Sequence, residues 1–135
     1  MTVQYSVSLR NAKLDVNESH IGTTPIFEIR TGAQPADCAT APSGNLLVQG
    51  SLPSDWANPA SSGTKTKNGT WSFTAVGAGT AGHYRIYDSG SPSTCHEQGS
   101  ITATGGGGDM TLDNTSIAIG QTVTVNTFTK TAGNA

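Results

Sequence analysis

"TATGGGGDMTLDNTSIAIGQTVTVNTF", residues 102–128, joins a run of four glycines to a segment in which apolar residues recur at every second position. The alternation is clearest in residues 121–131, QTVTVNTFTKT, which predict a strand with Val123, Val125 and Thr127 on one face. Threonine and valine both favour strands. The fold class therefore depends on whether the rest of the chain repeats this two-residue period.

Short alternating segments do recur along most of the chain. In residues 25–30, PIFEIR, Phe27 and Ile29 are expected on one face of a half-buried strand. The other predicted strands cover residues 45–52, 64–76, 82–88, 94–104 and 109–114. About seven or eight short strands separated by turn residues are typical of a β-sandwich or a small barrel.

Residues 64–76, TKTKNGTWSFTAV, contain the strongest short turn signal of the chain. Asn68-Gly69 is a dipeptide that favours a tight hairpin turn, and alternating Trp71, Phe73 and Ala75 follow it. The segment therefore predicts a hairpin.

The composition agrees with an all-β domain. In 135 residues, 34% are hydrophobic and only 12% are charged, so polarity comes mainly from Thr, Ser, Asn and Gly. Such a chain fits one domain of short strands and tight turns. We expect an all-β fold, a β-sandwich of jelly-roll or immunoglobulin-like type, with one short α-helix at the N-terminus.

Residues 5–22, YSVSLRNAKLDVNESHIG, are the segment that predicts this helix. Its apolar residues at helical spacing form one stripe: Tyr5, Leu9, Ala12 and Val16. Ser6 or Ser8 is the expected cap at its start, and Gly22 follows its end. The helix is expected to pack on a sheet edge or to dock on a neighbouring subunit. We divide the chain into an N-terminal helical arm, 1–22, and a β-sandwich domain, 23–135, and assign the stripe as the candidate partner contact.

The glycine run predicts a joint between strands, not a phosphate site. A phosphate-binding loop needs a strand-to-helix turn and, in the P-loop, Lys and Ser or Thr directly after the glycines. Here Asp109 and Met110 follow, and then a two-residue period. The run is therefore expected to let one strand leave a sheet and to let Met110 and Leu112 enter the next.

The sequence spacing of the Asp, Cys and His residues does not match a calcium or zinc site. Asp109 and Asp113 lack the pattern of a calcium loop, and on one strand they would lie roughly 13 Å apart. Cys95 and His96 are adjacent, so on a strand they point to opposite faces, and no zinc half-site is present. We expect no metal, no cofactor and no catalytic residues.

Two other chemistries rest on residue type alone. Paired carboxylates for glycoside hydrolysis could come from Glu28, Asp55, Asp88 and Glu97, but nothing in the sequence singles out two of them. A carbohydrate-binding module would use exposed aromatic rings, with Trp56 and Tyr87 as the platform. Core packing is the more common use of such rings.

Charge and hydropathy exclude two classes of partner. The net charge is −2 and no cluster of Lys and Arg occurs, so nucleic acid is not expected. No segment approaches the length of apolar sequence that spans a membrane. The first residues, MTVQYSVSLRNAK, lack the pattern of a secretory signal, so we expect synthesis in a cytosol-like compartment.

Cys38 and Cys95 leave two alternatives open. They are two reduced thiols, or they form one disulfide. That disulfide would close a loop of about 57 residues and add roughly 3–4 kcal/mol of stability by the chain-entropy argument.

Six segments together carry a resemblance to a known family: YSVSLRNAKLD, IGTTPIFEIRTGAQPADC, LPSDW, GTAGHYRIYD, CHEQGSITATGGGGDMTLDN and GQTVTVNTFT. In this order they resemble a family of small proteins encoded among the structural genes of tailed bacteriophages. The resemblance covers nearly the whole chain and is most specific from Gly79 to Phe128. It implies a virion component and carries over no catalytic residues.

We therefore expect a bacteriophage virion structural protein, assembled in the host cytoplasm, and among such proteins a capsid decoration (cement) protein. Its expected partners are the major capsid protein, other virion proteins and its own copies, as a homo-oligomer or bound to a lattice. The alternative within the class is a tail, neck, baseplate or fibre-adaptor protein, and the alternative outside it is the carbohydrate-binding module. We do not expect an enzyme.

Overall fold

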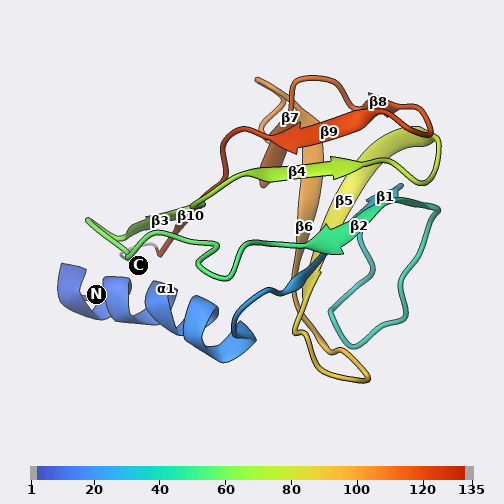
Figure 1. The fold of residues 1–135 in the computed structure, drawn as a ribbon. Coiled ribbons are helices and arrows are strands. Elements are labelled where there is room, and N and C mark those ends of the chain that lie inside the picture. The colour runs from blue at the N-terminus through green and yellow to red at the C-terminus, as the bar shows by residue number, and fades with distance from the viewer. Residues whose placement is uncertain (1–2, 133–135) are drawn as a thin grey trace.

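The chain is mostly β-strand with one helix, and the computed structural model describes residues 3–132 (Figure 1). The elements in chain order are α1 (Val7–Ile21), β1 (Ile26–Thr31), β2 (Leu46–Ser51), β3 (Thr64–Thr66), β4 (Trp71–Thr74), β5 (Gly79–Tyr87), β6 (Cys95–Ala103), β7 (Met110–Leu112), β8 (Ser116–Ile117), β9 (Thr122–Val125) and β10 (Thr129–Thr131). The predicted β-rich composition and the short N-terminal helix are both confirmed.

The largest sheet has the strand order β2-β1-β5-β6-β7, and β8 pairs with the start of β5. All of its pairs are antiparallel except β6 with β7. In its centre Phe27 lies opposite Ile86, and Ile29 lies opposite Tyr84. These four side chains share one face, as the two-residue period of β1 and β5 predicts.

Two short pairs of strands, β3 with β10 and β4 with β9, complete the β-structure. The predicted hairpin within residues 64–76 is wrong, because β3 and β4 do not pair with each other. At Asn68-Gly69 the chain turns around residues 55–56 instead: the Asn68 main chain donates to the Trp56 carbonyl, and its side chain donates to the Asp55 carbonyl. The turn signal was present, but distant strands supply better partners than the local ones.

The strand predicted over 121–131 is also interrupted. β9 ends at Val125, and β10 begins at Thr129. Thr127 is exposed and Phe128 is buried, so the predicted shared face of Val123, Val125 and Thr127 is wrong at its last member. The break at 126–128 lets the chain move from β4 to β3, and Phe128 enters the core there.

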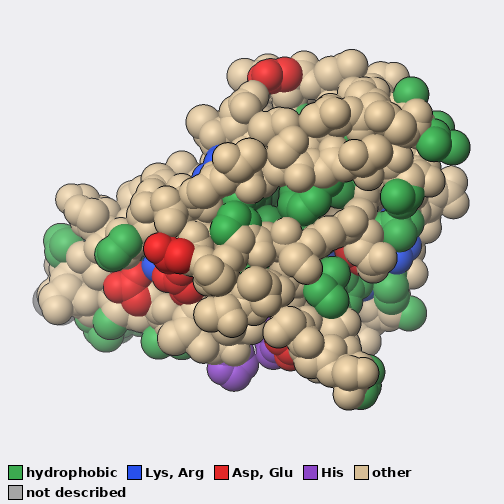
Figure 2. Space-filling view, in the orientation of Figure 1, with side chains coloured by type: hydrophobic (Ala, Val, Ile, Leu, Met, Phe, Trp, Pro, Cys, Tyr) green, Lys and Arg blue, Asp and Glu red, His purple; other side chains and the backbone are tan. Residues whose placement is uncertain are grey.

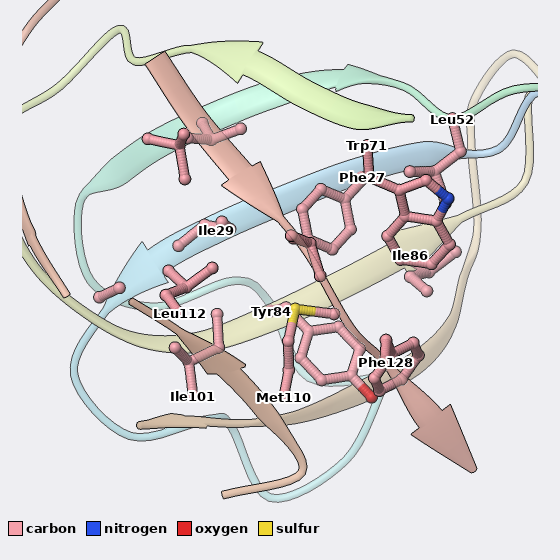
Figure 3. Packing of buried hydrophobic residues seen from close by; sticks show 14 of the residues in the cluster. Phe27, Ile29, Leu52, Trp71, Tyr84, Ile86, Ile101, Met110, Leu112 and Phe128 are labelled. Atoms are coloured by element: carbon pink, nitrogen blue, oxygen red, sulfur yellow. The ribbon is translucent and has the colours of Figure 1, made fainter. Parts of the chain in front are cut away.

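The core lies between the large sheet and the β4–β9 pair (Figure 3). Phe27 of β1 is fully buried and stacks near Phe73, with Trp71 and Tyr84 as its other ring neighbours. Aromatic contacts of this kind add to the stabilisation from apolar burial. Phe27 therefore connects β1 and β5 on one side with β4 on the other.

The glycine run connects two parallel neighbours in the same sheet. Ile101 of β6 lies beside Met110 of β7, and Ala103 lies beside Leu112. The prediction that β7 enters a different sheet is therefore wrong. Parallel strands ordinarily need a crossover of a dozen or more residues. Here the chain folds back on itself within residues 104–109, where Gly105 and Gly107 have φ values of +89° and +80°.

Candidate functional site

Helix α1 is the element that lies outside the sheets, and its position is fixed by specific contacts. Ser6 caps its start by accepting a hydrogen bond from the Leu9 main chain, and the Gly22 N–H bonds to the Glu18 carbonyl at its end. Within the helix, only Leu14 and Ile21 are fully buried. The helix packs against β3 and against the end of the described chain.

A buried lysine holds the helix to β3. The Lys65 side chain is only 1% exposed, and its Nζ lies 2.7 Å from Asp15 Oδ1 and 3.1 Å from Glu18 Oε1. It also donates to the Asn58 carbonyl at 2.9 Å. Burial acts to lower the pKa of Lys65, but the hydrogen bonds that Lys65 donates to Asp15 and Glu18 outweigh it and raise the pKa above 10.5. Lys65 therefore stays charged and bonded to the helix.

Three further hydrogen bonds add to this attachment. Arg10 Nε donates to the Ala132 carbonyl at 2.7 Å, the Gly63 N–H donates to Asn11 Oδ1 at 2.8 Å, and the Ala60 N–H donates to Asp15 Oδ1 at 2.9 Å. We call these contacts, together with Lys65, the helix clamp. Figure 2 shows acidic side chains gathered on the surface of this end of the molecule. The face of α1 that packs inward therefore combines these polar contacts with the buried side chains of Leu14 and Ile21.

The apolar stripe predicted from the sequence lies on the opposite side of α1. Leu9 is 46% exposed and Val16 is 58% exposed, about half a turn around the helix from Leu14 and Ile21. Ala12 is also exposed, and Tyr5 is half-buried. The stripe thus does not pack on a sheet, because polar contacts from the other face already hold the helix. Leu14 and Ile21, seven residues apart, were the sequence signal for the inward face, whereas Val7, a further seven residues earlier, is 50% exposed.

A groove of about 530 Å³ runs between α1, β10 and the glycine run, with Tyr84 and Glu97 in its wall. The Tyr84 hydroxyl donates to Glu97 Oε2 at 2.9 Å, and Lys130 Nζ lies 2.6 Å from Glu97 Oε1. Burial, together with the charge of Glu97, raises the pKa of Tyr84. Tyr84, Glu97 and Lys130 therefore bond to one another, and in this groove they form a structural hydrogen-bond network.

The second face of the large sheet is covered by residues 32–45, which we call the covering loop. His83 and Arg85 of β5 are 0% and 1% exposed, and their side chains bond to main-chain carbonyls of the covering loop. His83 Nδ1 lies 2.9 Å from the Gly32 carbonyl, and Arg85 NH2 donates to the carbonyls of Cys38 and Thr40 at 2.7 and 3.1 Å. The prolines, glycines and small residues of 31–44 predict a loop, but nothing in the sequence predicts that it covers the sheet.

The structure places Cys38 and Cys95 at this covered face as free, half-buried thiols. Arg85 Nε donates to Cys95 Sγ at 3.3 Å. Burial, together with a hydrogen bond and the charge of the neighbouring Cys95, raises the pKa of Cys38 to about 12. The two cysteines of the disulfide alternative are therefore neighbours, although 57 positions separate them in the sequence.

The carbohydrate-binding alternative requires Trp56 and Tyr87 to be exposed together, and Trp56 is not exposed. Trp56 is 1% exposed, and its ring nitrogen donates to the Gly22 carbonyl at 2.9 Å. It closes one end of the core, next to Trp71. Tyr87 is half-buried. A ring that lies within the core cannot stack on a sugar.

The four candidate carboxylates have separate structural partners. Asp55 bonds to Asn68, Asp88 to His96, Glu97 to Tyr84 and Lys130, and Glu28 to Arg30 and Gln49. Asp109 accepts from Ser100, whereas Asp113 accepts from Asn126. In residues 3–132 no group of three His, Cys, Asp or Glu side chains is placed to hold a metal ion. The described part of the chain also contains no helix suited to crossing a membrane.

No protein-family model, curated protein or solved structure matches the chain.

Proposed function

We propose that the chain is a structural protein of a tailed-bacteriophage virion and, within that class, a capsid decoration protein. The observation that carries the proposal is the outward apolar stripe on a helix that is clamped from its other side. Leu9 and Val16 are both about half exposed. A firmly held helix offers this surface to a partner at a low cost in conformational entropy. The resemblance of the sequence to phage structural proteins supplies the class.

The proposed mechanism is burial of the stripe against a neighbouring protein. On a capsid the same small contact is repeated in many copies, and linked contacts give strong attachment where one alone is weak. A stable contact of this kind buries on the order of 1,000 Å² or more. The proposed partners are the major capsid protein, other virion proteins and further copies of this chain. The proposed location is the virion, assembled in the host cytoplasm.

We also propose that the scaffold is a β-sandwich. The β4–β9 pair packs its apolar face on the large sheet, with Phe27, Trp71 and Phe73 in contact between them. This is how the two layers of a sandwich share one core. An experimental structure in which β4–β9 lies away from the large sheet would contradict this description.

The proposed function is tested with variants that change the surface of the stripe but leave the fold intact. The double variant Leu9→Asp, Val16→Asp places two charges on the stripe, and Ile119→Asp places one charge on an apolar side chain that is 72% exposed elsewhere. Both proteins should fold, because none of these positions lies in the core. We expect particles to bind the wild-type protein and Ile119→Asp in many copies per shell, and to lose the double variant.

Two results would contradict this proposal. Full occupancy of the shell by the stripe variant would show that another surface makes the contact. A small symmetric set of copies at one vertex, with none on the shell, would assign the protein to the neck or tail. Copy number is measured by quantitative mass spectrometry of purified particles, and position by cryo-electron microscopy.

A further inference from the structure

The covering loop meets β6 at a pair of cysteines. Cys38 lies in the loop, and Cys95 is the first residue of β6. Arg85, on the neighbouring strand β5, touches both: NH2 bonds to the Cys38 carbonyl at 2.7 Å, and Nε bonds to Cys95 Sγ at 3.3 Å. Both thiols are half-buried, so a small reagent can reach them.

Arg85 is a buried cation whose hydrogen bonds in the described structure include no carboxylate. Its partners are the carbonyls of Cys38 and Thr40 and the sulfur of Cys95, and NH1 has none. The carboxylate directly opposite on β1, Glu28, accepts hydrogen bonds from Arg30 and Gln49. Buried charges in proteins are ordinarily paired. Among these partners, the Cys95 sulfur is the atom that can take up a negative charge.

We propose that Cys38 and Cys95 are a disulfide-forming pair, in which Cys95 is the attacking thiol, Arg85 supports it, and the bond fastens the covering loop to β6. This inference stands on the contacts of Arg85 and does not depend on the proposed role in a virion. The raised pKa of Cys38 agrees with this division of roles, because that thiol keeps its proton until the second step.

The reaction needs an oxidant, for which a small disulfide such as oxidised glutathione suffices. Cys95 loses its proton to water and attacks one sulfur of the reagent; the reagent's S–S bond breaks, and one glutathione leaves and takes up a proton. Cys38 then loses its proton and attacks Cys95 Sγ, which releases the second glutathione. Two protein thiols are oxidised, and one glutathione disulfide is reduced to two thiols.

The first experiment counts thiols. The full chain is equilibrated with reduced or with oxidised glutathione, quenched with acid, unfolded, and labelled with N-ethylmaleimide for mass spectrometry. We expect two labels after reduction and none after oxidation, with the oxidised protein monomeric and free of glutathione. Retention of both labels in oxidised glutathione, or a product with two bound glutathiones, would overturn the proposal.

The second experiment tests which thiol attacks. Cys38→Ser leaves Cys95 beside Arg85, and Cys95→Ser leaves Cys38, so the two variants are matched controls for each other. Both substitutions are small and lie outside the apolar core. We expect Cys38→Ser to form its mixed disulfide with glutathione at least tenfold faster than Cys95→Ser. Equal rates, or the reverse order, would overturn the assignment of Cys95.

Discussion

Each of the four consecutive glycines occupies a position where a side chain would be unfavourable, and the cause alternates along the run between backbone conformation and steric overlap. Gly105 and Gly107 have positive φ, with nothing within 4 Å of the position that a Cβ would take. Gly106 and Gly108 have no such φ, but a Cβ there would lie 2.7 and 2.9 Å from atoms of Thr102. The run therefore combines two left-handed residues with two close approaches to β6, which is how six residues suffice to return the chain beside the strand it has just left.

This alternation predicts different tolerance at neighbouring positions. Asn adopts a positive φ more readily than Ala does, so Gly107→Asn should destabilise the protein less than Gly107→Ala, which should cost about 1–2 kcal/mol. At Gly108 the added side chain itself collides, so Asn should be no better than Ala. Urea unfolding of the four variants measures this. If Asn is less destabilising than Ala at Gly108 as well as at Gly107, the same cause acts at both positions and this prediction is wrong.

At the scale of single residues, the sequence predicts which side chains share a face but not what covers that face. Phe27, Ile29, Tyr84 and Ile86 lie together as the two-residue period requires. The same period places His83 and Arg85 on the opposite face, which a solvated sheet would leave exposed. They are buried, because the covering loop supplies carbonyl partners from a segment that has no periodic pattern. The burial of Lys65 was missed because its carboxylate partners, Asp15 and Glu18, lie in a segment distant in the sequence.

At the scale of elements, local signals identified strands and turns correctly but not their partners. Asn68-Gly69 does mark a turn, yet β3 pairs with β10 and β4 with β9. For α1, the strongest apolar stripe indicated a contact with a sheet edge or with a partner, and the structure packs a different face, on which Leu14 and Ile21 lie beside polar contacts. A buried lysine with two carboxylate partners also holds that face. Lys65 lies 50 and 47 positions from these partners, so no rule based on neighbouring residues can predict the pairing.

The helix clamp makes the attachment of α1 sensitive to acid. The hydrogen bond from Lys65, and then that from the Ala60 N–H, lower the pKa of Asp15 below 3.8. Asp15 therefore stabilises the fold above pH 3.8, and this contribution is lost as the pH falls through the lowered pKa. We expect the free energy of unfolding of the wild type to fall more steeply between about pH 5 and pH 2 than that of Asp15→Asn.

Urea midpoints across that pH range, for both proteins, measure the difference. Asp37 and Asp88 also have lowered pKa values, set mainly by hydrogen bonds from Thr40 and His96, and they are common to both proteins. The wild-type and Asp15→Asn curves should therefore converge toward low pH. Parallel curves would mean that the charge on Asp15 contributes nothing to holding the helix.

At the scale of the whole molecule, the central sheet is covered on its two faces by different chemistry. One face packs apolar side chains against β4 and β9, whereas the other holds the covering loop through buried polar side chains. The polar side leaves three buried atoms without a hydrogen-bond partner in the described structure: His83 Nε2, Arg85 NH1 and Gln98 Oε1. Unpaired buried polar atoms weaken a fold. The apolar side must therefore supply most of the stability.

This difference predicts that the whole protein unfolds as one unit when the apolar side fails. Phe27 is fully buried and contacts rings of both layers, so Phe27→Ala should cost about 3–5 kcal/mol, whereas Val76→Ala, at an exposed position, should cost almost nothing. Tryptophan fluorescence reports on Trp56 and Trp71 in the core, and far-ultraviolet circular dichroism reports on the helix as well. Because Trp56 also bonds to Gly22 at the end of α1, the two signals should change together during urea unfolding of Phe27→Ala. A helix signal that survives after the core signal is lost would mean that α1 is held independently of the sheets, and could present its stripe without them.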